Sequence, residues 1–447
     1  MRGLTAPGPV HWIVRTLEDA GFETWAVGGA VRDALAGIPS GDWDLATRAT
    51  PREVRRIFRR TVPIGVDHGT MGVLARDGTL FEVTTFRKDV ETTGRHAVVE
   101  FADELDDDLA RRDFTINAVA WHPIRKVVHD PFEGAVDLER GVLRTVGSPE
   151  DRLAEDYLRV LRALRFAGAF QLRIEGRTWR ALTAAVPRVG VLSPERIREE
   201  LEKILAGAAP PSRALGLYAA SGLLSALYGE LDATVGEERS GAGGDWFSHA
   251  LRAVDLLPAS RPTLRWAALL QGVGEPEAPG DEEAHPWDRG LLRSAAVLER
   301  LRSSNARIAE ISQLVPWVAR PPDPRGTDAE LRRWLARAGR ERLPALLRLW
   351  SAAVRADELR DGPWNRGDFN TLAARLRALA RSGLPLEVGE LALSGRDLIR
   401  MGYSPGPLFG EVLRFLLDQV LEAPELNRPE YLRDEASRWL EARMPDE

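Results

Sequence analysis

The sequence predicts an α+β protein, with a small mixed α/β head followed by an all-helical remainder. In the first third of the chain, short stretches with strand composition alternate with stretches of helical spacing. After about Arg144 the strand signals fade, and Leu, Ala, Arg and Glu recur at helical spacing. A chain of 447 residues is also too long for one ordinary core, so we expect several domains.

The elements of the head follow one another in a regular order. "HWIVRTLEDAG" (11–21) has helical spacing and ends at a glycine, and "FETWAVGG" (22–29) predicts a strand that runs into a glycine turn. "AVRDALAG" (30–37) predicts a helix that its last glycine closes. β-branched and aromatic residues then predict strands in "DWDLAT" (42–47) and "TLFEVTTFR" (79–87).

The helical remainder is interrupted by loops rich in proline and glycine at 236–245, 274–286 and 320–326. These interruptions and the loss of strand signals suggest three parts. We expect a head over 1–147, a helical neck over 148–235, and a helical body and tail over 246–447.

The composition excludes several classes of protein. The chain is 44% hydrophobic and 29% charged, which is an ordinary balance for a soluble globular protein. Since it contains no cysteine, a disulfide framework and a thiolate metal site are both excluded. The N-terminus has no apolar run typical of a signal peptide, and no stretch approaches the ~20 apolar residues of a membrane span. We therefore expect a cytoplasmic protein that does not enter a membrane.

The net charge of −6 argues against a protein that is basic throughout, so a polyanion would have to meet a local patch. One candidate is "RATPREVRRIFRR" (48–60), in which six arginines face a single acid, Glu53. The alternative is an ordinary solvated helix face.

Two aspartates, Asp42 and Asp44, flank one tryptophan in "GDWD" (41–44). In a strand these carboxylates would project side by side, with Trp43 turned into the opposite layer. Carboxylates this close repel and raise one another's pKa, and a divalent cation removes that cost. Mg²⁺ suits such oxygen ligands and typically binds one or two carboxylates together with phosphates of a substrate. An exposed Asp-x-Asp turn is the alternative.

A glycine pair, Gly28 and Gly29, lies just upstream at the start of a predicted helix. Such a turn offers backbone N–H groups to phosphate, and Arg32 on the first turn of the helix can add a charge-assisted contact. The twelve residues between Gly29 and Asp42 suffice for one short helix and a return. Phosphate cradle and metal pair would then face one pocket, whereas a ligand-free tight turn is the alternative reading.

Five stretches, in this order, resemble one family. "GGAVRDALAG…GDWDLAT" is similar to the signature of nucleotidyltransferases of the polymerase-β superfamily. "RRDFTINAVAW" (111–121) narrows the resemblance to class II tRNA nucleotidyltransferases (CCA-adding enzymes) and the related bacterial poly(A) polymerases. The other matches are "DPFEGAVDLERGVLRTVG" (130–147), "EDYLRVLRALRF" (155–166) and "SPERIREELEKIL" (193–205).

The resemblance implies that Asp42 and Asp44 are the catalytic carboxylates and hold two Mg²⁺ ions for in-line displacement of pyrophosphate. Glu82 could act as a third carboxylate, or it could be an ordinary strand residue. Arg112 and Asp113 would contact the sugar and triphosphate of the incoming nucleotide, where a donor and an acceptor suit selection through the 2′-OH. An Arg–Asp salt bridge that caps a helix is the alternative for this last pair.

Asp156 and Arg159, three positions apart on a predicted helix, are the expected base-reading pair. Cytosine and adenine both present an amino donor beside a ring-nitrogen acceptor, so Asp156 can accept and Arg159 can donate. Guanine and uracil present the opposite polarity, and about 1–3 kcal/mol is at stake for each good base contact. A surface ion pair between the two is the alternative. The resemblance places Arg162 and Arg165, at the same spacing, near the phosphates and base.

In relatives the helical remainder grips the acceptor arm of tRNA, and residues 393–432 resemble the final segment of many bacterial members. "LRWAALLQGVGEP" (264–276) resembles the "ALLHDIGKP" of a metal-dependent phosphohydrolase (HD) domain. Gln271 and Gly272 stand where His and Asp would be, and neither is a good metal ligand. We therefore expect no hydrolase activity from this region and a structural role for His249.

The function implied is addition of CCA to the tRNA 3′ end from CTP and ATP. The alternatives are an enzyme that adds only CC or only A, and a poly(A) polymerase, since all share these residues. Loop length around 87–101 separates some of them, and no gross deletion is evident there. An idle RNA-binding scaffold and a phosphohydrolase are disfavoured by the intact aspartate pair and by Gln271 and Gly272, respectively. The sequence does not indicate the oligomeric state.

Overall fold

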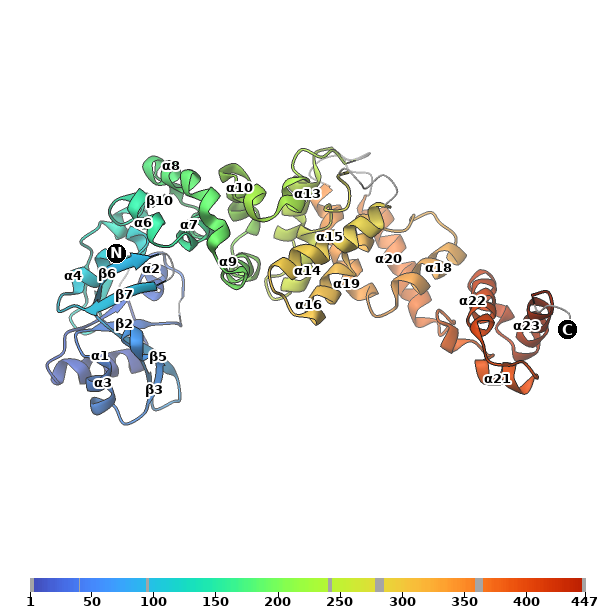
Figure 1. The fold of residues 1–447 in the computed structure, drawn as a ribbon, viewed down its shortest axis with the longest axis horizontal. Coiled ribbons are helices and arrows are strands. Elements are labelled where there is room, and N and C mark those ends of the chain that lie inside the picture. The colour runs from blue at the N-terminus through green and yellow to red at the C-terminus, as the bar shows by residue number, and fades with distance from the viewer. Residues whose placement is uncertain are drawn as a thin grey trace. The chain divides into compact units, whose positions relative to one another are not determined.

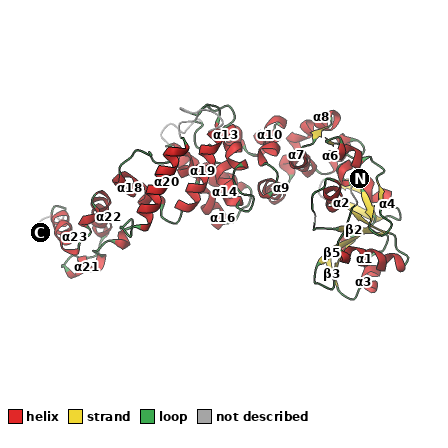
Figure 2. Cartoon of the chain, turned by 180° about the vertical axis from the view of Figure 1, so that it is seen from behind, coloured by secondary structure: helices red, strands yellow, loops and turns green. Residues whose placement is uncertain are grey.

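The computed structural model of the chain describes residues 4–39, 41–93, 96–239, 243–277, 285–357 and 365–443. The chain divides into two compact units, residues 1–229 (unit 1) and 230–447 (unit 2), which are described separately. Strands occur only in unit 1 among the named elements, as Figure 2 shows by colour. The α+β architecture predicted from the sequence is confirmed. The predicted borders at 147, 235 and 246 stay predictions.

A seven-stranded mixed sheet forms the head (Figure 1). Its central strands β2 and β5 are parallel, and the other neighbours in the sheet are antiparallel. In spatial order the strands are β3 (Thr61–Gly65), β4 (Thr70–Leu74), β5 (Leu80–Thr85), β2 (Asp44–Thr47), β1 (Thr24–Val27), β8 (Ala120–His122) and β9 (Val127–His129).

Apolar side chains cover the sheet on both sides, and two separate core clusters result. One cluster contains Ile13 and Leu17 of the first helix together with Trp43, whereas the other contains Trp25 and Phe86. The helices of the head are α1 (Gly8–Asp19), α2 (Gly29–Leu35), α3 (Pro51–Ile57), α4 (Leu105–Ala110) and α5 (Gly134–Glu139). The helices and strands predicted over 11–37 and 79–87 are confirmed, and of the strand predicted over 42–47 the structure has residues 44–47.

Residues 87–101, in which the sequence shows no gross deletion, include a two-stranded antiparallel hairpin of β6 (Arg87–Thr93) and β7 (His96–Phe101). The arginines of 48–60 lie in and around α3 and are exposed, so this basic face is open to solvent. Binding of a polyanion there stays a prediction.

The rest of unit 1 is helical, apart from a short parallel pair of β10 (Val142–Leu143) and β11 (Arg173–Ile174). Its helices α7 and α10 approach closely at Gly168, where an added Cβ atom would lie 2.6 Å from the backbone nitrogen of Ala214. The helices are α6 (Pro149–Glu155), α7 (Leu158–Phe170), α8 (Gly176–Ala185), α9 (Pro194–Ala206), α10 (Pro211–Ser221) and α11 (Leu223–Leu227).

Unit 2 is helical throughout its described named elements, as the sequence predicts. Apolar residues of its last helices form a core cluster of their own around Leu398, Leu416 and Leu432. The α-helices are α12 (Gly229–Asp232), α13 (Trp246–Asp255), α14 (Pro262–Leu269), α15 (Pro286–Arg300), α16 (Asn305–Ser312), α17 (Val315–Ala319), α18 (Asp328–Ala338), α19 (Leu343–Asp357), α20 (Arg366–Arg381), α21 (Gly395–Arg400), α22 (Pro407–Glu422) and α23 (Pro429–Glu441).

Candidate active site

A cavity of about 670 Å³ in unit 1, here called the head cavity, gathers most of the residues that the sequence singles out. The strand ends of the sheet supply one wall, and α7 and α9 supply another. Asp42 is the one predicted site residue that does not line it. The predicted residues that do are Gly28, Gly29, Arg32, Asp44, Arg112, Asp113, Asp156, Arg159, Arg162 and Arg165.

The glycine turn and the aspartate meet because β1 and β2 pair antiparallel with Val27 opposite Asp44. Gly28 follows directly and has a φ of 75°, which favours glycine. A Cβ atom at this position would lie 3.1 Å from Nη1 of Arg112 and 3.5 Å from Oδ2 of Asp44. A side chain at position 28 would therefore strain the backbone and push against Arg112.

The pKa of Asp44 shows that this aspartate is partly buried near other acids. Burial, and then the nearby carboxylates of Asp42 and Glu82, raise the pKa of Asp44 to about 6, although Arg112 opposes this. Asp42 is exposed and precedes β2, so the expectation that both aspartates lie within the strand is wrong. Trp43 nevertheless turns into the core against Trp121, as alternation along an extended chain requires.

Glu82 lies on β5 and lines the head cavity. The charges of Glu82 and Asp42 both act on Asp44. No group of three His, Asp or Glu in the described part of the chain is close enough to form a complete metal site by itself.

Arg112 and Asp113 do not pair with each other. Arg112 donates to Asp108 at 3.0 Å and to the backbone oxygen of Asn117 at 3.3 Å. Asp113 accepts from Arg162 at 2.7 Å, and although burial opposes it, this arginine holds the pKa of Asp113 below its ordinary value. The alternative of a local Arg–Asp pair is thus wrong, because each of the two side chains has its charged partner elsewhere.

Arg32 is buried on α2 and is held from several sides. Its guanidinium donates to Asp33 at 2.7 and 2.9 Å and to the side-chain oxygen of Asn117 at 2.7 Å. The rings of Phe170 and Phe166 lie 4.5 and 4.8 Å from its carbon Cζ, within the range of a cation–π interaction. These contacts make Arg32 a fixed cation in the wall of the head cavity.

Asp156 is not helical, which corrects the prediction of one continuous helix. It is an extended residue that ends α6, and α7 begins two positions later at Leu158. Its carboxylate accepts from the backbone N–H of Leu158 at 3.0 Å and from Arg196 at 2.6 Å. Arg159, on the first turn of α7, pairs instead with Glu155. The alternative of an ion pair between Asp156 and Arg159 is therefore wrong.

Arg162 and Arg165 continue along α7 and flank the ring of Phe166, at 5.1 and 4.2 Å from its centroid. Arg162 binds Asp113, and Arg165 donates to Glu200 of α9 at 2.6 Å. Three arginines of α7 thus each meet a carboxylate of this chain, so the cavity is highly charged yet locally balanced.

Sequence reasoning missed several residues that line or support this cavity. Asp108, Asn117 and Glu200 orient the predicted arginines, and Arg196 orients Asp156. Arg196 and Glu200 belong to the stretch 193–205, which carried the family resemblance but gave no contact of its own. A signal existed in the spacing, because Glu200 stands three positions after Ile197 and four before Ile204. It therefore falls on the apolar face of the predicted helix, where an acid needs a partner elsewhere in the fold.

None of the described helices is long and apolar enough to cross a membrane. Two protein families match the chain: one described as "Poly A polymerase head domain" over residues 24–144, and one described as "Probable RNA and SrmB- binding site of polymerase A" over residues 171–234. Both matches lie in unit 1 except for the last residues of the second.

Full-length relatives are similar along nearly the whole chain. The CCA-adding enzyme of Limosilactobacillus fermentum is 34% identical over 437 residues, covering 97% of both chains. That of Geobacillus thermodenitrificans is 33% identical over 422 residues, covering 94% of this chain and 93% of the relative. The crystal structure of the Bacillus stearothermophilus CCA-adding enzyme in complex with CTP matches with a TM-score of 0.71 and 29% identity, covering 98% of this chain and 99% of that one.

Proposed function

The chain belongs to the family of CCA-adding enzymes, and we propose that its head cavity joins CTP, CTP and then ATP to the 3′ end of tRNA, releasing pyrophosphate. The single observation that carries this proposal is the content of one cavity. It combines the carboxylate of Asp44, a glycine turn at Gly28 and Gly29, and the donor–acceptor pair Arg159 and Asp156.

We further propose that Asp42 and Asp44 hold Mg²⁺, with Glu82 as a third carboxylate. The raised pKa of Asp44 supports this fit, since a divalent cation would relieve the repulsion among these carboxylates. When bound, such ions activate the attacking hydroxyl and stabilise the departing pyrophosphate. The protein's own contribution is to fix Asp44 beside the glycine turn through the pairing of β1 with β2, and Glu82 through the pairing of β5 with β4.

The triphosphate is held, in this proposal, by the backbone N–H groups at the start of α2 and by the cationic wall of Arg32, Arg162 and Arg165. Arg112 and Asp113 face the ribose. Because acids of the chain already orient these side chains, they are positioned before a nucleotide binds, which lowers the ordering cost of binding.

Asp156 and Arg159 read the base. Asp156 accepts from the amino group that cytosine and adenine share, and Arg159 donates to the adjacent ring nitrogen. A carboxylate has about four acceptor sites, so Asp156 can retain Arg196 and the N–H of Leu158 while it accepts from a base. Uracil and guanine present a carbonyl beside an N–H, so the carboxylate of Asp156 would face an acceptor and the guanidinium of Arg159 would face a donor.

The helical remainder binds the acceptor arm of tRNA in this proposal.

The test is nucleotide incorporation by the purified protein with Mg²⁺ on three tRNAs that lack CCA, end in C, or end in CC. CTP and ATP are supplied separately and together, with Asp42→Ala/Asp44→Ala as the control.

Extension of the first tRNA to CCA and no further is the expected result, with no incorporation by the control. Arrest at CC, or addition of A only to the tRNA ending in CC, would make the protein a partial enzyme. Long A tails would make it a poly(A) polymerase. No incorporation on any substrate would leave an RNA-binding scaffold.

A further inference from the structure

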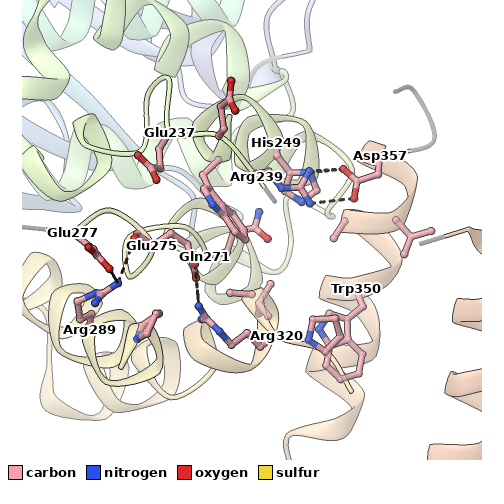
Figure 3. Close-up of a pocket in the computed structure, with 18 residues that line it drawn as sticks. Glu237, Arg239, His249, Gln271, Glu275, Glu277, Arg289, Arg320, Trp350 and Asp357 are labelled. Atoms are coloured by element: carbon pink, nitrogen blue, oxygen red, sulfur yellow. Dashed lines mark hydrogen bonds and ion pairs between the residues drawn. The ribbon is translucent and has the colours of Figure 1, made fainter. Parts of the chain in front are cut away.

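Unit 2 contains a second cavity, of about 630 Å³, which shares no residue with the proposed site of nucleotide addition (Figure 3). We call it the body cavity. Residues of α13, α15, α17 and α19 line it, together with residues before α13, after α14 and after α17. It includes His249 and Gln271 from the region that resembles a phosphohydrolase domain.

The charges that a metal would need at this cavity are already engaged by the protein itself. His249 is buried and its Nδ1 lies 2.8 Å from Asp357. Arg239 donates to both oxygens of Asp357 at 2.6 and 3.2 Å, as Figure 3 shows. Although burial opposes it, hydrogen bonds from His249 and Arg239 lower the pKa of Asp357 to about 2. The guanidinium of Arg239 thus occupies the position beside Asp357 that a metal ion would need.

Gly272 leaves no room for a ligating side chain. A Cβ atom there would lie 2.7 Å from Cβ of Trp246, which packs over the glycine. The wall of the body cavity therefore has the indole of Trp246 where a phosphohydrolase would have an acid. Trp350 also lines the cavity.

Gln271 supplies the most specific requirement on that ligand. Its side chain lines the cavity and is only 2% exposed, and its Nε2 has no hydrogen-bond partner among the described residues. A buried amide without a partner is unfavourable, so a ligand with a hydrogen-bond acceptor at this point would remove the cost.

The charge balance of the cavity disfavours phosphate. Arg239 is paired with Asp357, Arg320 binds Glu275 at 2.8 Å, and Arg289 lies 3.9 Å from Glu277. Two further acids, Glu237 and Glu238, line the exposed part of the cavity and form no ion pair within the described chain. These two carboxylates would repel an anion and would accept from hydroxyl or amino groups.

We propose that the body cavity binds a nucleoside without its phosphates. The planar base would lie at the edge of the Trp246 ring, over which the guanidinium of Arg239 lies at 5.2 Å, and offer an acceptor to Nε2 of Gln271. The ribose hydroxyls would donate to Glu237 and Glu238. The body cavity would thus favour an uncharged ligand and repel phosphates, whereas the proposed ligands of the head cavity are nucleoside triphosphates.

The test is calorimetric titration of the full chain with adenosine, cytidine, guanosine, uridine and AMP, in the presence of saturating CTP to occupy the head cavity. We expect at least one nucleoside to bind with one site per chain. If that nucleoside is adenosine, AMP should bind about tenfold more weakly because of the added charge. The other nucleosides are compared with their own monophosphates.

Gln271→Leu should weaken binding of the nucleoside about tenfold. Ser312→Ala, which changes a buried polar residue outside the cavity, should leave the affinity unchanged. Glu237→Gln/Glu238→Gln should reduce the difference in affinity between a nucleoside and its monophosphate. The matched control is Glu299→Gln/Glu310→Gln, two exposed acids of unit 2 outside the cavity. Arg159→Met, in the head, should leave nucleoside binding unchanged.

Incorporation of CTP by Gln271→Leu at the unmodified rate would show that this variant is folded, so its loss of binding could be attributed to the cavity. The proposal is overturned if no nucleoside binds, if the monophosphate binds more tightly than its nucleoside, or if Gln271→Leu binds normally. Loss of nucleoside binding in Arg159→Met would also overturn it, because the ligand would then occupy the head.

Discussion

Arg196 donates a hydrogen bond of 2.6 Å to Asp156, although forty positions separate the two residues in the sequence. The bond joins α9 to the break between α6 and α7, where Asp156 has extended backbone. Asp156 therefore depends on two donors, Arg196 and the N–H of Leu158, for the orientation of its carboxylate. Arg196 is thus a positioning residue for the proposed reading of the base.

Replacing Arg196 by Met should impair selection more than chemistry. Without the guanidinium, Asp156 can rotate, and the preference for CTP over UTP should fall about tenfold, the effect of one charge-assisted hydrogen bond. The measurement is the ratio of kcat/KM for CTP and UTP on a tRNA that lacks CCA. Arg198→Met, on the same helix, is the control and should keep the ratio. An unchanged ratio in Arg196→Met would remove Arg196 from base selection.

Asp44→Asn should stabilise the protein in the absence of metal. The pKa of Asp44 is raised from 3.8 to about 6, so its ionisation disfavours the folded state fully above pH 6 and not below 3.8. The gain in the free energy of unfolding should be about 1–3 kcal/mol at pH 7.5 and about half that at pH 5. Urea unfolding in EDTA measures it.

The control for this stability measurement is Asp103→Asn, which changes an exposed carboxylate outside the head cavity. It should show no such pH-dependent gain. A loss of stability in Asp44→Asn at pH 7.5 would mean that the carboxylate is stabilised by the fold, contrary to its raised pKa.

The rate of nucleotide addition should fall as the pH drops below about 6 when Mg²⁺ is limiting. Asp44 must be ionised to bind a cation, and protons and Mg²⁺ compete for the same carboxylate. Raising Mg²⁺ tenfold should move the acid limb of kcat/KM for CTP to lower pH by up to about one unit. An acid limb that stays fixed as Mg²⁺ changes would assign it to a group that does not bind the metal.

Gly168→Ala should destabilise unit 1. The added methyl would meet the backbone of Ala214 at 2.6 Å, so α7 and α10 must separate, at a cost of about 1–3 kcal/mol. Gly216→Ala is a matched control on α10, since nothing lies within 4 Å of the added atom, and it should stabilise the helix by up to about 1 kcal/mol. Thermal unfolding of both variants measures the difference. Equal melting temperatures would show that the two helices part without cost.

The sequence predicted the head best where local rules decide the outcome. The strand–glycine–helix order around Gly28 and the return to Asp44 followed from turn chemistry and spacing, and the structure has both. Trp43 followed from alternation along an extended segment. Family resemblance, in turn, found the arginines of α7 that line the head cavity.

The partners of these side chains were not predictable from spacing. Asp156 looked helical because leucines and arginines surround it at helical intervals, but its carboxylate binds the N–H of Leu158 and so favours a break. Arg162 meets Asp113 from another part of the fold, and Arg165 meets Glu200 from another helix. Such pairs are set by tertiary packing, which a local pattern does not contain.

The pairing of Val27 with Asp44 affects the specific activity of a purified sample of this protein. A slip of β2 by one residue against β1 would put Trp43 in the head cavity and send Asp44 toward the apolar layer. A misregistered molecule would add to the mass of a sample and contribute nothing to turnover. Activity per milligram therefore falls as the fraction of chains in which β1 and β2 have paired out of register rises.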